Sequence, residues 1–109
     1  MARDPGLEAI LFEELGGLDG LTDKAMFGGW AWLLEGHLLC GARTDGMLVR
    51  LGKGQDGWAL ALPGVAAMIS RGKPMAGWVR AEARAFANDQ VRRQLLDAAL
   101  RFVAALPRK

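Results

Sequence analysis

The sequence has 109 residues, of which 51% are hydrophobic and 24% are charged, and its formal net charge is +2. This length suits one domain and is too short for two independent cores. The composition excludes a disordered chain, which combines low hydrophobicity with high net charge. We therefore expect a single folded domain over residues 1–109.

A helix is the first predicted element, and it begins at Asp4-Pro5. The aspartate carboxylate can accept hydrogen bonds from free amides at a helix start, and the fixed φ of proline suits the first helical position. Gly16 and Gly17 should end this helix, because glycine adopts the left-handed conformation that closes a last turn. The apolar residues between these limits repeat with a helical period, and they are Leu7, Ile10, Leu11, Leu15 and Leu18.

From Lys24 onward, short apolar runs alternate with turn residues, which predicts an antiparallel meander. Strands are expected at residues 30–34, 37–42 and 47–51, and residues 24–27 are a candidate for another strand. Glu35-Gly36 and Asp45-Gly46 supply the positive φ angles that tight hairpins need.

Both faces of the 30–34 strand are apolar, because Trp30 and Trp32 alternate with Ala31 and Leu33. Such a strand is either covered by helices on both sides or leaves one face for a partner. We favour core packing for the two tryptophans, and the alternative is a binding surface.

The second half of the sequence predicts a short helix at 56–62 and two strands, 67–70 and 75–80, around the turn Arg71-Gly72-Lys73-Pro74. A closing helix capped by Asn88 carries a continuous apolar stripe and ends before Pro107. On its outer face Arg93, Asp97 and Arg101 are spaced for i,i+4 ion pairs. The predicted fold is α+β, with an antiparallel meander, flanking helices and the order αβββαββα.

Catalytic and metal chemistry has little support in the sequence. His37 and Cys40 are the only residues of their types, which excludes metal sites built from several histidines or cysteines. Their spacing on one strand places them on opposite faces, so they cannot form a nucleophile and base pair within it. Gly28-Gly29 leads into a strand and lacks a phosphate-loop pattern, which favours a structural role. We predict no catalytic residue, no cofactor and no metal.

The sequence favours the cytoplasm. Acidic residues interrupt the early apolar stretch, which excludes a signal peptide, and a lone cysteine suits a reducing compartment. The longest uncharged apolar window, residues 25–34, is too short to cross a membrane.

A nucleic-acid-binding role is the alternative that the charge pattern raises. Residues 61–109 contain nine Lys/Arg and three Asp/Glu, whereas residues 1–41 contain two and seven. These cations either complement the acidic first helix or contact phosphates, and we favour the first reading. The candidate phosphate contacts are Arg71, Lys73, Arg80, Arg92 and Arg93, with Trp78 as a ring for base stacking.

Two motifs together resemble a known family. One is Met26-Phe27-Gly28-Gly29, which precedes Trp30 and Trp32, and the other runs from Arg71-Gly72-Lys73-Pro74-Met75 to Gly77-Trp78-Val79. Over residues 5–107 the sequence resembles the amino-terminal domain family of TfoX, also called Sxy, the bacterial competence regulators, and in particular its stand-alone short members.

This resemblance implies an α+β fold grouped with secretion-chaperone-like domains, no enzymatic activity, and a role in regulating transcription of DNA-uptake genes. We therefore expect an interaction domain in the bacterial cytoplasm with a protein partner still to be identified, and no membrane association. A homodimer through a sheet edge or the tryptophan face is a further option. The candidate surface consists of the two motifs, that is Met26, Phe27, Gly28, Gly29, Trp30, Trp32, Arg71, Gly72, Lys73, Pro74, Met75 and Trp78.

Overall fold

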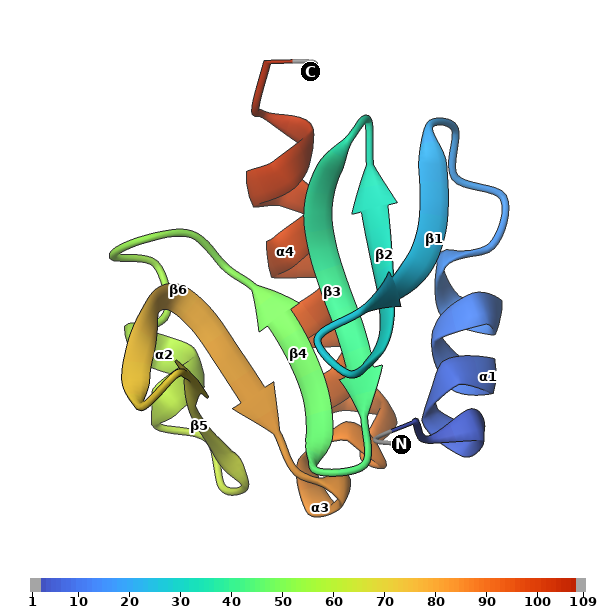
Figure 1. The fold of residues 1–109 in the computed structure, drawn as a ribbon. Coiled ribbons are helices and arrows are strands. Elements are labelled where there is room, and N and C mark those ends of the chain that lie inside the picture. Colours follow the sequence, from blue (N-terminus) through green and yellow to red (C-terminus); the bar gives the residue numbers. More distant parts are fainter. Residues whose placement is uncertain (1–2, 108–109) are drawn as a thin grey trace.

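One antiparallel sheet organises the chain, with strand order β1-β2-β3-β4-β6-β5 (Figure 1). The structure is a computed structural model that describes residues 3–107. The strands are β1 (Leu21–Met26), β2 (Gly29–Leu34), β3 (His37–Arg43), β4 (Gly46–Arg50), β5 (Val65–Ser70) and β6 (Lys73–Ala81). The helices are α1 (Pro5–Leu15), α2 (Gly57–Leu60), α3 (Ala83–Phe86) and α4 (Asp89–Ala104).

The predicted α+β class and antiparallel meander are confirmed, but the element order is αββββαββαα. The meander begins with a complete strand, β1, whereas the sequence predicts only a candidate strand at residues 24–27. Residue 27 lies in the turn after β1. Because β1 lies at the sheet edge and is mostly exposed, its sequence lacks the apolar alternation of a half-buried strand. At the other end, the short helix α3 precedes α4.

Local capping explains where the two long helices begin. The Asp4 side chain accepts a hydrogen bond from the Leu7 amide at 3.1 Å, and Asn88 does the same for Val91 at 3.1 Å. After α1, Gly17 takes a φ of 90°, as expected for a helix end. Leu18 lies beyond the helix and is exposed, so it does not belong to the buried face as predicted.

Helices α1 and α4 lie against the same face of the sheet and form the main core with it (Figure 1). Trp32 is fully buried there, and its ring meets Phe12 of α1 edge to face with 5.1 Å between the ring centroids. Cys40 and Val49 lie beside it on β3 and β4, which fits the alternation of these strands.

The predicted i,i+4 ion pairs on α4 are wrong within the part of the chain that the structure describes. Arg93 reaches across to α1, where its Nε lies 3.6 Å from the Glu14 carboxylate. Asp97 forms no ion pair with either arginine, because α1 presents Arg93 with an acid from the adjacent helix.

Candidate interaction surface

The sheet has a second face, turned away from α1 and α4, which we call the open face. Cross-strand pairing on β4 and β6 places Leu48 opposite Arg80 and Arg50 opposite Trp78 on this face. A second hydrophobic cluster lies here, and within residues 3–107 each of its side chains comes from a strand or a turn. Its members are Phe27, Leu38, Leu48, Met68, Met75 and Trp78.

Phe27 reaches this cluster because the β1–β2 hairpin curls over the open face (Figure 1). The turn is formed by Phe27 and Gly28 with φ angles of 59° and 73°, the left-handed pair typical of a two-residue hairpin loop. A bulky residue at positive φ is strained by roughly 1–3 kcal/mol, and such outliers cluster at functional sites. The Phe27 ring packs beside Gly41, where an added Cβ would lie 3.6 Å from the ring.

The two sequence motifs meet at one aromatic contact. Phe27 of the first motif stacks edge to face on Trp78 of the second, with 5.7 Å between ring centroids and 66° between the ring planes. Met75 packs against the same cluster. Phe27 and Met75 are half-buried, whereas Trp78 is nearly covered, so apolar surface remains accessible over a tightly packed base.

The remaining candidate residues lie elsewhere. Trp32 is in the helix-covered core, and Trp30 is held at its margin, where its indole N–H donates to Asp23 at 2.9 Å and the Arg3 guanidinium lies 4.5 Å from its ring. Met26, Gly28 and Gly29 line a depression of about 320 Å³ at the turn end of the β1–β2 hairpin. The turn residues Arg71, Gly72, Lys73 and Pro74 are exposed and do not belong to the aromatic cluster.

Sequence reasoning missed several residues of the open face, namely Leu38, Leu48, Met68 and Arg50. Their positions depend on register: a bulge between Trp32 and Leu33 changes the pairing so that Leu33 faces Leu38. The alternation along β4 could have separated Leu48 and Arg50 from Val49, but it does not say which side a helix covers.

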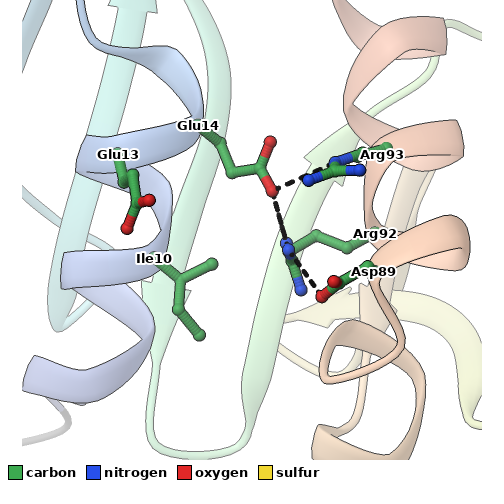
Figure 2. Close-up of a pocket in the computed structure, with 6 residues that line it drawn as sticks. All are labelled: Ile10, Glu13, Glu14, Asp89, Arg92 and Arg93. Carbon is green, nitrogen blue, oxygen red and sulfur yellow. Dashed lines mark hydrogen bonds and ion pairs between the residues drawn. The ribbon is translucent and has the colours of Figure 1, made fainter.

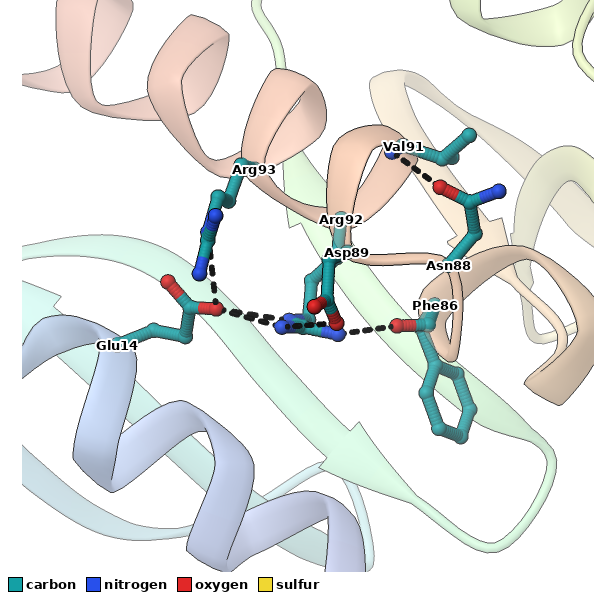
Figure 3. A network of polar contacts seen from close by, with 7 residues as sticks. All are labelled: Glu14, Phe86, Asn88, Asp89, Val91, Arg92 and Arg93. Atoms are coloured by element: carbon teal, nitrogen blue, oxygen red, sulfur yellow. Dashed lines mark hydrogen bonds and ion pairs between the residues drawn. The ribbon is translucent and has the colours of Figure 1, made fainter.

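On the helix side, the buried Arg92 joins α4 to α1 through hydrogen bonds and ion pairs, which we call the Arg92 clamp. A cleft of about 390 Å³ lies here, and most of its lining consists of acidic and basic side chains of the two helices (Figure 2). Its centre is Arg92, whose three guanidinium nitrogens all donate hydrogen bonds (Figure 3). The acceptors are Glu14 at 2.7 and 3.0 Å, Asp89 at 3.0 Å and the Phe86 carbonyl at 2.9 Å.

This clamp is structural, and it corrects the predicted phosphate contacts. Arg92 is buried and its charge is already neutralised, while Arg93 pairs with Glu14. Burial alone would lower the pKa of Arg92, but the hydrogen bonds to Glu14 and Asp89 outweigh it and raise that pKa. Arg80 donates to the Asp45 carbonyl at 2.8 Å. The five predicted cations therefore do not form one accessible track.

No hydrogen bond joins Cys40 and His37 within residues 3–107. The bulge between Trp32 and Leu33 puts both residues on the helix side of β3, so their predicted placement on opposite faces is wrong. Cys40 is completely buried, and burial raises the pKa of its thiol far above the ordinary range. His37 lies at the start of β3, where its Nε2 and the Pro107 carbonyl form a hydrogen bond. No group of three His, Cys, Asp or Glu side chains within residues 3–107 is placed to hold a metal ion.

Across the described residues, no helix combines the length and apolar character required to span a membrane. In the comparison with protein families, the model of the TfoX N-terminal domain matches residues 13–103. Comparison with curated proteins finds no match, and comparison with solved structures finds none either.

Proposed function

The chain belongs to the TfoX N-terminal domain family, and we propose that it is a non-enzymatic interaction domain that binds a protein partner through its open face. The family consists of non-catalytic domains. The observation that carries the proposal is the Phe27–Trp78 contact, which joins both motifs on the one sheet face that α1 and α4 leave uncovered.

Exposure and charge on this face suit a protein partner. Leu33, Leu38 and Met75 are half-buried, so they still present apolar surface, and Arg80 lies on the same face. Aromatic residues, Met and Arg are the types enriched where proteins bind one another. The strained Phe27 turn is fixed by its packing against Trp78, which makes the face rigid before a partner arrives.

The biological role that we propose is regulatory. By analogy with the competence regulators that give the family its name, the domain acts in the bacterial cytoplasm in the transcriptional control of DNA-uptake genes. The partner is another protein or a second copy of this chain. Direct nucleic-acid binding is a weaker alternative, because Arg92 and Arg93 are committed to Glu14.

Substitutions on the open face test the proposal. Leu33→Glu and Met75→Glu place a carboxylate on this face, and Ala9→Glu and Ala104→Glu place one on exposed helical positions as matched controls. Analytical ultracentrifugation reports self-association, affinity capture from the host reports a different partner, and transcript levels of DNA-uptake genes report regulation. We expect the open-face variants to lose binding while keeping their circular dichroism spectrum.

A folded open-face variant that retains every association of the unsubstituted chain would contradict the proposal. So would a protein that stays monomeric at high concentration and captures no specific partner. A shift of DNA or RNA at low salt that weakens steeply as salt rises would instead favour the nucleic-acid alternative.

A further inference from the structure

A groove on the helix side of the sheet, far along α4 from the Arg92 clamp, has no role in the function proposed above. It has a volume of about 440 Å³ and is formed by the loop after β4, by α2 and by the last turns of α4. Trp58 and Phe102 supply its aromatic surface, and Trp58 is 39% exposed although it is one of the largest apolar side chains. We call this feature the Trp58 groove.

The charged side chains that line the Trp58 groove are both positive. Lys53 and Arg101 line it together with the neutral Gln55, and no acidic side chain does. The Arg50 guanidinium lies 5.5 Å from the centre of the Phe102 ring and adds a third cation at the margin.

Arg50, Lys53 and Arg101 differ from most of the other cations that the structure describes, because no acid pairs with them. Within residues 3–107, ion pairs with acids engage Arg3, Arg43, Arg84, Arg92 and Arg93. Arg50, Lys53 and Arg101 have none, even though Asp97 stands one helical turn before Arg101. Arg50 donates a hydrogen bond to the Leu38 carbonyl, whereas Lys53 and Arg101 are exposed. A groove with these two cations beside the exposed Trp58 ring and the half-buried Phe102 ring is complementary to an apolar group that carries negative charge.

We propose that the Trp58 groove binds an acidic peptide segment of a partner protein. An aromatic or aliphatic side chain of the segment packs between Trp58 and Phe102, and neighbouring carboxylates pair with Lys53 and Arg101. Because Lys53, Trp58 and Arg101 are exposed, the groove is a surface feature that suits an extended chain better than a small ligand, which is normally enclosed.

Charge spacing favours this occupant over nucleic acid. Binding to a nucleic acid strand relies on a continuous run of cations that follows successive phosphates. Here Asp56 comes three residues after Lys53, and Asp97 comes four residues before Arg101. These two acids interrupt the run of cations in the sequence. A short acidic segment needs only the local pair.

The test uses the full chain and a synthetic peptide in which Glu-Phe-Glu is flanked by Gly and Ser. Isothermal titration calorimetry gives its affinity, and ¹⁵N-resolved NMR gives the residues it perturbs, including the Trp58 indole N–H. The test variant is Lys53→Glu with Arg101→Glu. The control is Lys24→Glu with Lys73→Glu, which makes the same change in net charge at exposed, unpaired cations of β1 and β6.

We expect resonances of Trp58 and Phe102 to shift with the peptide, and the groove variant to bind at least about tenfold more weakly than the control variant. Trp58→Ala should also weaken peptide binding, whereas Met75→Glu on the open face should not. The proposal for the Trp58 groove can therefore be disproved independently of the proposal for the open face. The proposal is overturned if the peptide leaves the groove resonances unchanged, if the control variant loses as much affinity as the groove variant, or if a single-stranded oligonucleotide occupies the groove more tightly than the peptide.

Discussion

The guanidinium group of Arg92 on α4 donates two hydrogen bonds to one carboxylate oxygen of Glu14 on α1, at 2.7 and 3.0 Å, and so joins two residues that lie 78 positions apart in sequence. The arginine side chain is only 8% exposed. A buried charge of this kind depends on its partner, because removing either side leaves the other uncompensated.

Replacing Arg92 should therefore destabilise the chain more than replacing its neighbour. We expect Arg92→Leu to lower the free energy of unfolding by roughly 3 kcal/mol, because Glu14 and the Phe86 carbonyl lose their donors. Arg93→Leu removes an exposed cation and should change stability by less than about 0.5 kcal/mol. Urea denaturation followed by circular dichroism measures the free energy of unfolding of both variants. Equal losses would show that the buried hydrogen bonds of Arg92 stabilise the fold no more than the exposed ion pair of Arg93 does.

Acidic pH should weaken the start of α1. The pKa of Glu8 is lowered from 4.5, chiefly because its carboxylate accepts two hydrogen bonds from Arg3. The folded chain therefore binds fewer protons here than the unfolded chain, so this contribution is complete above 4.5 and is lost as the pH falls through the lowered pKa. Asp45 acts in the same direction beside Arg43.

Urea titrations at about pH 6 and about pH 3 would measure this loss. Glu8→Gln removes one titrating group, so the variant should be less stable than the unsubstituted chain at the higher pH and should lose less stability on acidification. An unchanged pH dependence in Glu8→Gln would assign the acid sensitivity to other carboxylates.

The aromatic contact on the open face should be measurable as a coupling energy. In a double-mutant cycle with Phe27→Leu and Trp78→Leu, we expect the two changes to be non-additive by about 0.5–1.5 kcal/mol, the usual value for an edge-to-face pair. Chemical denaturation of the four proteins gives this value. Strictly additive losses would mean that the rings are neighbours without a specific interaction.

A close backbone approach at Gly77 should make that glycine irreplaceable. A Cβ there would lie 2.5 Å from the backbone of Gly52 and Lys53, at the crossing where the Gly77 carbonyl accepts from the Leu51 and Gly52 amides. Gly54 has a similar positive φ, 81° against 84°, but an added Cβ would meet nothing within 4 Å.

The pair Gly77→Ala and Gly54→Ala therefore separates backbone strain from collision. Gly54→Ala should cost only about 1 kcal/mol, since an alanine tolerates positive φ at that penalty. Gly77→Ala should cost at least about 3 kcal/mol or prevent folding, because two backbone segments must move apart. Thermal unfolding of both variants decides the matter, and a well-folded Gly77→Ala of equal stability would show that the crossing is loose.

Local chemistry explains which features of the fold could be predicted from the sequence. Asp4, Asn88 and the glycine-containing turns act over three or four residues, so they predict the helix starts and the hairpins without knowledge of the rest of the fold. The residues of the two motifs were sufficient to identify the family. Strand alternation also separated Trp30 and Trp32 from Ala31 and Leu33.

Which of those two faces α1 covers could not be predicted from the sequence, because alternation is the same whichever side a helix packs against. The tertiary structure answers this question. It placed Trp32 beneath Phe12 and brought Phe27 to Trp78 from the opposite half of the sheet. The helical period placed Arg92 on the face that holds Leu95 and Leu96, but its burial depends on a carboxylate from a distant segment. The Trp58 groove likewise depends on the tertiary structure, since no local rule places Trp58 of α2 and Phe102 of α4 along one cavity.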